Sequence, residues 1–245
     1  MLSRRAALVG TAALAATPAL AQSDGPSNGP WAIELFTSQG CSSCPPADAR
    51  LGQLAGRPDI VALSFHVDYW DYIGWKDRFA TKETTARQHA YARSLKQRYV
   101  YTPEMVVDGI AHDAGVAPGS IEALLAEARQ RSPRRATPEM ARADDGSLTI
   151  LIAAFPLDAP ADIVLAVYDR HHATPVHRGE NDGRTLDNFN VVRRFETVAR
   201  WNGEAAHWHV PADRFMPGQG VAVLVQRADQ GGMLGCNKLE PRTTG

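Results

Sequence analysis

Apolar residues in the first half of the chain follow two different spacings. Residues 31–37 and 60–68 are almost continuously apolar and β-prone, which is typical of strands covered on both faces of a sheet. Between them, Asp48, Leu51 and Leu54 recur at helical spacing until a Gly-Arg-Pro sequence ends the run. This succession of strand, helix and strand predicts a βαβ unit with two parallel strands.

The pattern changes partway along the chain. The first part predicts helices over about 78–99 and 118–130, and a hairpin strand at 100–109 that a proline opens and an Asp-Gly turn closes. Beyond it, about seven short β-prone runs are separated by turns. We therefore expect an α/β domain over residues 31–132 and an all-β domain over residues 133–245, the latter resembling an antiparallel β-sandwich.

The first 30 residues carry a targeting signal and a linker. Residues 1–21 combine two arginines, an apolar stretch and an Ala-Leu-Ala ending, which predicts a signal peptide cleaved near Ala21. The adjacent Arg4 and Arg5 fit either the general secretory or the twin-arginine route, so we expect a periplasmic or secreted protein. Residues 22–30 are a polar Gly/Pro/Ser linker.

The charge balance argues against two classes of partner. The chain has 26 basic and 27 acidic residues and a formal net charge of −1. It has neither the basic excess typical of nucleic-acid binding nor a basic amphipathic segment typical of a membrane surface. We therefore expect no nucleic-acid partner and no stable membrane insertion after signal cleavage.

Two of the three cysteines form a Cys-Ser-Ser-Cys motif at the predicted start of the first helix. The amides and dipole of a helix N-terminus stabilise a thiolate, so we expect Cys41 to be the exposed, attacking sulfur and Cys44 the resolving one. In a strand–helix–strand context the motif predicts thioredoxin-like redox chemistry, with a protein or small-thiol substrate and no cofactor. A structural disulfide or part of a metal site are the alternatives. Cys236 is expected to be buried and inert rather than a third redox partner.

Five further residues are candidates for the same site. Glu34 precedes the motif and is either a buried proton relay or a carboxylate in water at the end of a strand. The Thr102–Pro103 bond is expected to be cis, which makes Pro103 a site residue and leaves the Thr102 backbone free to pair with an extended peptide. Tyr69 and Trp70 either wall a substrate groove or pack their loop onto a helix.

Two other patterns invite sharper interpretations. His66 and Asp68 share a strand face and would complete a copper or zinc site with the thiolates, but such residues more often only finish a strand, so we predict no metal ligand. The Gly-rich segment 179–184 lacks the strand-to-helix context of a nucleotide loop. It is instead a candidate to reach over the Cys motif, with contacts from Arg184, Asn190 or Arg193.

Four segments together resemble a family of exported bacterial thioredoxin-like proteins of unknown function: FTSQGCSSCPPAD, SFHVDYWDYIGWKD, YTPEMVVDG and GENDGRTLDNFNVVRRF. The resemblance implies a thioredoxin-like fold for residues 31–132, export and a redox role, but it supplies neither a reaction nor a substrate. The function we expect is that of an exported thiol-disulfide oxidoreductase. A non-catalytic binding protein with a structural disulfide and a periplasmic copper or zinc handling protein are the alternatives.

Overall fold

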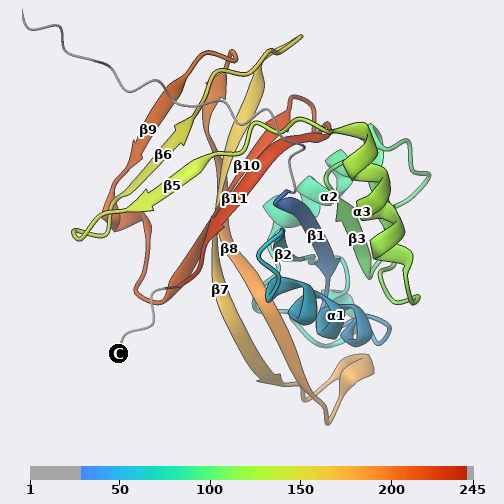
Figure 1. Cartoon of the computed structure of the whole chain (residues 1–245). Helices are drawn as coiled ribbons and strands as arrows, with labels where there is room; N and C mark the ends of the chain where they lie inside the picture. The colour runs from blue at the N-terminus through green and yellow to red at the C-terminus, as the bar shows by residue number, and fades with distance from the viewer. Residues whose placement is uncertain (1–28, 242–245) are drawn as a thin grey trace, which may run out of the picture.

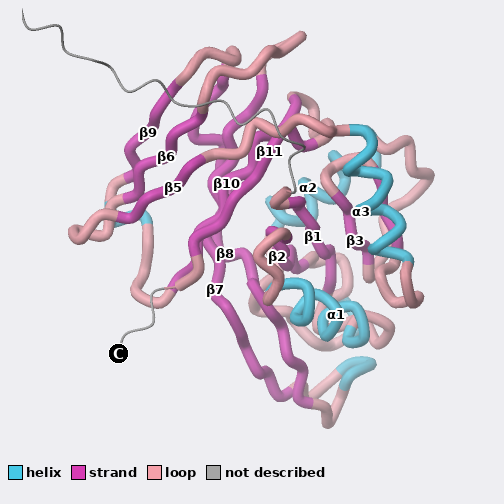
Figure 2. The backbone as a smooth tube through the Cα atoms, viewed as in Figure 1, coloured by secondary structure: helices cyan, strands magenta, loops and turns pink. Residues whose placement is uncertain are grey.

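Strands from both halves of the chain make up most of the fold (Figures 1 and 2). This computed structural model describes residues 29–241, so the predicted signal peptide and most of the predicted linker lie outside the described residues. The elements of the first half are β1 (Trp31–Thr37), α1 (Pro45–Ala55), β2 (Ile60–His66), η1 (Asp71–Ile73), α2 (Lys82–Ser94), β3 (Glu104–Val107), β4 (Ala111–Asp113) and α3 (Ser120–Arg131). Those of the second half are β5 (Glu139–Arg142), β6 (Leu148–Ile152), β7 (Ala161–Pro175), η2 (Gly179–Asn181), β8 (Thr185–Trp201), β9 (Ala206–Val210), η3 (Ala212–Arg214), β10 (Gln219–Arg227) and β11 (Met233–Leu239).

The strands form two sheets. Eight of them make one mixed sheet in the order β11-β10-β7-β8-β2-β1-β3-β4, and three make a smaller sheet in the order β5-β6-β9. Strand β1 runs parallel to β2 and antiparallel to β3, which confirms the predicted parallel pair. The smaller sheet packs against the far part of the large one, away from the helices (Figure 1).

Alternate residues of β1 point into two different cores. Ile33 and Leu35 pack with the apolar faces of α1 and α3, whereas Ala32 and Phe36 pack on the opposite side with Tyr91 of α2. All seven residues of β1 are buried, as expected for a strand that is covered on both faces. None of the described helices is long and apolar enough to cross a membrane.

The predicted fold class is wrong. We expected an α/β thioredoxin-like domain followed by an antiparallel β-sandwich-like domain, but the structure is mostly β, with three α-helices among residues 29–241 and one mixed sheet that takes strands from both halves. The halves join where Ser64 of β2 lies opposite Val191 of β8 in a parallel pair. The Asn190 side-chain amide strengthens this junction by donating to the Ala62 carbonyl oxygen at 2.8 Å. Apolar alternation marks a strand but not the edge with which it pairs, so the pattern could not reveal this junction.

Local signals predicted most of the elements themselves. The hairpin at residues 100–109 is confirmed, since β3 and β4 pair across a turn at Asp108 and Gly109, both of which have positive φ. The helix expected over 78–99 is shorter, because Thr81 caps its start through the Thr84 amide. Strands β7 and β8 extend well beyond the predicted runs and form a long hairpin whose far end reaches α1 (Figure 1).

Candidate functional site

The Cys loop, residues 38–44, connects β1 to the first turn of α1. Cys44 is the N-cap, and two prolines follow it as the first helical residues, where a missing amide costs no hydrogen bond. Both sulfurs are free, so the pair forms no disulfide in this structure. Cys44 is fully buried, and Cys41 is only 1% exposed, so the expectation of an exposed Cys41 is wrong: the loop and the segments packed on it cover this residue. The loop therefore presents an adjacent pair of reduced, covered thiols at a helix start.

The surroundings of the two sulfurs push their acidities in opposite directions. Hydrogen bonding from the Cys44 thiol lowers the pKa of Cys41 to about 6 against the opposing effect of burial. Ser43 adds to this effect, since its hydroxyl lies 3.2 Å from the Cys41 sulfur. Burial raises the pKa of Cys44 far above the ordinary thiol value, and the neighbouring Cys41 and Asp48 raise it further. Cys41 is thus a thiolate near neutral pH and Cys44 a thiol.

The predicted Thr-Pro element lies beside Cys41. The Thr102–Pro103 peptide bond is cis, as predicted, and the Thr102 carbonyl oxygen is 3.8 Å from the Cys41 sulfur. The Trp70 indole N–H donates to the Thr102 hydroxyl at 2.7 Å. Trp70 also packs on the Cys loop, because a Cβ placed on Gly40 would lie 3.1 Å from the Trp70 Cβ.

Tyr69 and Trp70 combine the two roles that were considered for them. Their rings pack against each other at 6.4 Å and against the core under α2, which anchors the loop. Burial raises the pKa of the Tyr69 hydroxyl, so it stays protonated at neutral pH. Trp70 also bonds directly to Thr102, the residue that touches the Cys41 sulfur.

Glu34 does not lie in water, since it is 1% exposed. Its carboxylate accepts hydrogen bonds from the Arg87 guanidinium, at 2.9 Å from Nη2, and from the Tyr91 hydroxyl. Its partners are therefore a cation and a phenol, and neither is a sulfur of the Cys pair. Neither of the two roles considered for Glu34, a proton relay or a carboxylate in water, matches these contacts, which make it one half of a buried ion pair.

Asp48 is a buried carboxyl next to Cys44, and it is not among the site residues predicted from the sequence. The Thr37 hydroxyl donates to Asp48 Oδ2 at 3.2 Å and is also a hydrogen-bond partner of the Cys44 sulfur. Burial raises the pKa of Asp48 to about 7, with nearby His66 opposing the shift. The spacing in the sequence predicts this neighbour, because residues four apart on a helix share one face and Asp48 follows Cys44 by four residues.

His66 and Asp77 form a second buried pair below the Cys loop. His66 Nδ1 lies 2.7 Å from Asp77 Oδ2, and the same oxygen accepts the Gln39 amide at 2.8 Å. Burial alone would lower the pKa of His66, but the Asp77 carboxylate reverses the effect and the pKa is raised. Within the described part of the chain, no three His, Cys, Asp or Glu side chains converge as metal ligands would.

The far end of the β7–β8 hairpin closes over the Cys loop, and we call residues 178–184 the hairpin tip. The Asn181 side-chain amide donates to the carbonyl oxygens of Gln39 and Cys41, each at 3.0 Å. Of the residues considered as contacts for this segment, Arg184 supports Asn181 at 2.8 Å. Asn190 instead bonds to β2, and Arg193 lies over the Phe79 ring.

Cys236 is buried in another part of the molecule, as predicted. Its thiol donates to the Pro30 carbonyl oxygen at 3.2 Å and lies 3.9 Å from the Arg135 guanidinium. Burial raises the pKa of Cys236 to about 12. It is therefore a protonated thiol that packs between the first and last strands, remote from the chemistry of the Cys loop.

Residues 32–226 match a family model described as a protein of unknown function, DUF1223. The chain belongs to this family. An X-ray crystal structure of a protein from Agrobacterium tumefaciens is 33% identical, with a TM-score of 0.77 over 89% of this chain and 96% of that one. HBP35 of Porphyromonas gingivalis is 15% identical, with a TM-score of 0.60 over 88% of this chain and 77% of that one, which shows similarity of fold alone. No curated protein matches the chain.

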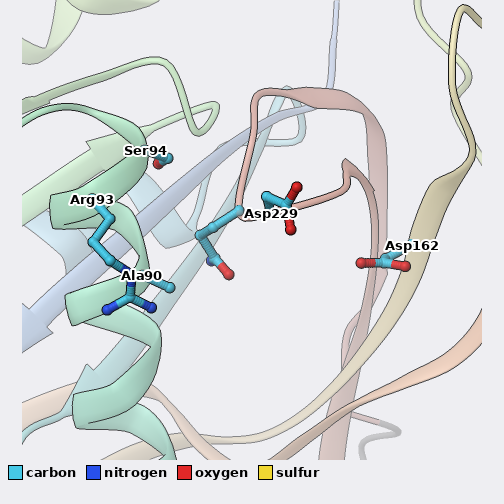
Figure 3. A pocket seen from close by; sticks show the side chains of 6 residues that line it. Ala90, Arg93, Ser94, Asp162 and Asp229 are labelled. Atoms are coloured by element: carbon cyan, nitrogen blue, oxygen red, sulfur yellow. The ribbon is translucent and has the colours of Figure 1, made fainter.

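Two cavities in this DUF1223 chain lie outside the immediate surroundings of the sulfurs. One, of about 510 Å³, opens between α2 and the β10–β11 turn and is lined by Arg93, Asp162 and Asp229 among others (Figure 3). The other, of about 410 Å³, lies between α1 and the start of β8, with Pro45 and Arg184 among its lining residues. Only the second cavity borders both the Cys-bearing helix and the hairpin tip.

Proposed function

We propose that the protein is an exported thiol-disulfide oxidoreductase that works through Cys41 and Cys44. The observation that carries the proposal is the split acidity of two adjacent free thiols, with the pKa of Cys41 lowered to about 6 and that of Cys44 raised. Two equivalent thiols would compete for the attack, whereas this pair has one thiolate and one reserve thiol. The proposal rests on this site and not on the fold class.

In the first step the Cys41 thiolate attacks one sulfur of a substrate disulfide. A bond forms between Cys41 and that sulfur, the substrate disulfide breaks, and the second substrate sulfur leaves as a thiolate. Hydrogen bonds from Ser43 and Cys44 stabilise the thiolate before the attack, and they are lost when the sulfur becomes neutral in the mixed disulfide. Thr102, supported by Pro103, lies next to the reacting sulfur, so its backbone is the proposed partner of an extended substrate peptide, with Trp70 and Tyr69 beside it.

In the second step Cys44 resolves the mixed disulfide. The loss of the Cys41 negative charge removes two of the causes that raise the pKa of Cys44. The Cys44 proton passes through the Thr37 hydroxyl to Asp48, whose pKa of about 7 suits it to accept a proton near neutral pH. The Cys44 sulfur then bonds to Cys41 and the substrate leaves as a second thiolate. The net result is one disulfide reduced to two thiols and one dithiol oxidised.

The proposal is tested with the chain after signal removal, residues 22–245, in a reduction assay on a disulfide-bonded protein such as insulin. Cys41→Ser should abolish turnover, and Cys44→Ser should accumulate a mixed disulfide that mass spectrometry detects on Cys41. Cys236→Ala is the control and should keep wild-type activity, because that thiol lies in another part of the molecule.

Two results would contradict the proposal. Equal activity in the two Cys-loop variants would show that the pair does not exchange disulfides. A reduction potential below about −300 mV would identify a structural bond that cellular thiols do not reduce.

A further inference from the structure

The hairpin tip holds the Cys loop through main-chain groups of that loop. Asn181 binds two of its carbonyl oxygens, and Glu180 Oε2 accepts the Ser42 amide at 3.0 Å. Asn181 is fully buried, and the Arg184 guanidinium fixes the orientation of its amide. A long hairpin from the second half of the chain therefore places one carboxylate at the turn that carries the redox pair.

That carboxylate binds the Cys loop at the residue next to Cys41. The Ser42 nitrogen belongs to the peptide bond that links Cys41 to Ser42. The Glu180 oxygen that accepts this N–H therefore lies at the residue next to Cys41. The Ser42 bond lowers the pKa of Glu180, which is therefore an anion at neutral pH. The Cys loop just before α1 therefore holds the Cys41 thiolate and, at the amide of the next residue, a second anion that belongs to the hairpin tip.

Oxidation removes one of these two charges. A thiolate at Cys41 would be repelled by a carboxylate held at the next residue's amide, whereas a Cys41–Cys44 disulfide is neutral and would not be. Other charged or titratable groups on the elements packed around the Cys loop include Cys44, Asp48, His66, Tyr69, Asp71, Asp77, Glu104, Arg178, Asp182 and Arg184. The Ser42 amide, which adjoins Cys41, donates to Glu180 and to none of these groups in the described part of the chain.

We propose that Glu180 is a positioning residue that destabilises the Cys41 thiolate relative to the thiol and biases the Cys pair toward its disulfide form. This inference rests on the proposed function only for its redox consequence. The hairpin thus adjusts the acidity of Cys41 and the reduction potential of the Cys pair, although it lies far from the Cys motif in the sequence. Its loop contacts set the acidity of the nucleophile without touching the sulfur.

The test compares Glu180→Gln with wild type. Glutamine can still accept the Ser42 amide through its carbonyl oxygen, so the variant removes the charge and keeps the bond. The pKa of Cys41 is read from the pH dependence of its alkylation by iodoacetamide, with the modified residue identified by mass spectrometry. We expect the midpoint to fall by about half a pH unit at low salt, and by less at 1 M salt, where charges are screened.

The matched control is Asp182→Asn, which removes an exposed carboxylate of the same tip that has no bond to the Cys loop among the described residues. Its midpoint should stay near that of wild type. An unchanged midpoint in Glu180→Gln, or an equal fall in both variants, would overturn the proposal. Alkylation needs no turnover, so this result holds whether or not the protein reduces disulfides.

The redox consequence is measured separately by equilibration with a glutathione buffer. A half-unit fall in pKa is about a threefold change in equilibrium constant, which for a two-electron couple is about 15 mV. The potential of Glu180→Gln should rise by that amount, because its reduced form is stabilised. A potential that falls or does not move would contradict the redox part of the inference.

Discussion

Two buried carboxylates, Glu34 and Asp48, lie in the same half of the molecule and behave differently. Glu34 is 1% exposed and Asp48 is 3% exposed, so burial does not distinguish them. Glu34 has a guanidinium partner in Arg87, together with the Tyr91 hydroxyl. Asp48 has only neutral hydrogen-bond partners, the Thr37 hydroxyl and the Asn188 side chain, and the cationic group that acts on it is the imidazole of His66.

The difference shows that the partner decides what a buried carboxylate does. A charge that is matched by a guanidinium is a structural link, and the Glu34–Arg87 pair joins β1, α2 and Gln226 of β10. A charge without such a match titrates near neutral pH and is available for proton transfer. The position of Glu34 before the Cys motif was therefore misleading, whereas Asp48 has the environment that the proposed chemistry needs.

Breaking the Glu34 pair should have the largest effect. Glu34→Gln leaves the buried Arg87 charge without its counterion, which costs about 3–5 kcal/mol of unfolding free energy. Urea denaturation of the reduced protein at pH 7 measures the loss. Glu204→Gln, which alters an exposed carboxylate, is the control and should change stability by less than about 0.5 kcal/mol. A loss in Glu34→Gln as small as in the control would show that the pair is not a structural link.

Removing the Asp48 carboxyl should have the opposite sign. The folded protein retains a proton on Asp48 up to about pH 7, whereas the unfolded chain releases it near pH 4, so the carboxyl lowers stability as pH rises through this window. Relative to wild type, Asp48→Asn should gain about 1.4 kcal/mol of stability per pH unit from pH 4 to 7 and no more above it. Denaturation curves at several pH values test this, and parallel profiles for the two proteins would contradict it.

The same variant should slow the proposed resolving step. Asp48→Asn cannot accept the Cys44 proton, so resolution of a mixed disulfide at pH 7 should be slowed at least about tenfold. Stopped-flow measurement with a disulfide that leaves a chromophoric thiol separates the first step, which should be unaffected, from the second. If the variant resolved the mixed disulfide at the same rate as wild type, Asp48 would have no part in the mechanism.

The smallest expected effect is that of the Glu34 pair on the acidity of Cys41, because Glu34 does not contact either sulfur of the Cys pair. Tyr91→Phe removes one hydrogen bond to Glu34 and should lower stability by about 1.5–3 kcal/mol, but the midpoint of Cys41 alkylation should remain near pH 6. A shift of that midpoint by half a unit or more would mean that the Glu34 cluster does act on the Cys pair.

Local sequence signals predicted the parts of the site that lie close together in the chain. The apolar run of β1, the two prolines that open α1 and the Cys spacing together place both sulfurs at a helix start, and the structure has them there. The Thr102–Pro103 turn was also predicted, because a proline at the head of a strand next to an Asp-Gly turn is a local pattern. Each of these features depends on residues within a few positions of one another.

The segments that meet at the Cys loop from far along the chain are set by the tertiary structure. Strand β8 joins the sheet at β2, and this pairing both overturns the expected fold class and brings Glu180 and Asn181 to the loop. The choice of Arg87 as the partner of Glu34 likewise depends on how α2 packs across β1. The thiol pair at a helix start follows from the sequence, because backbone propensity and residue type act locally. The groups that we propose to tune this pair come to it through strand pairing and helix packing, which the periodicity of a single segment does not encode.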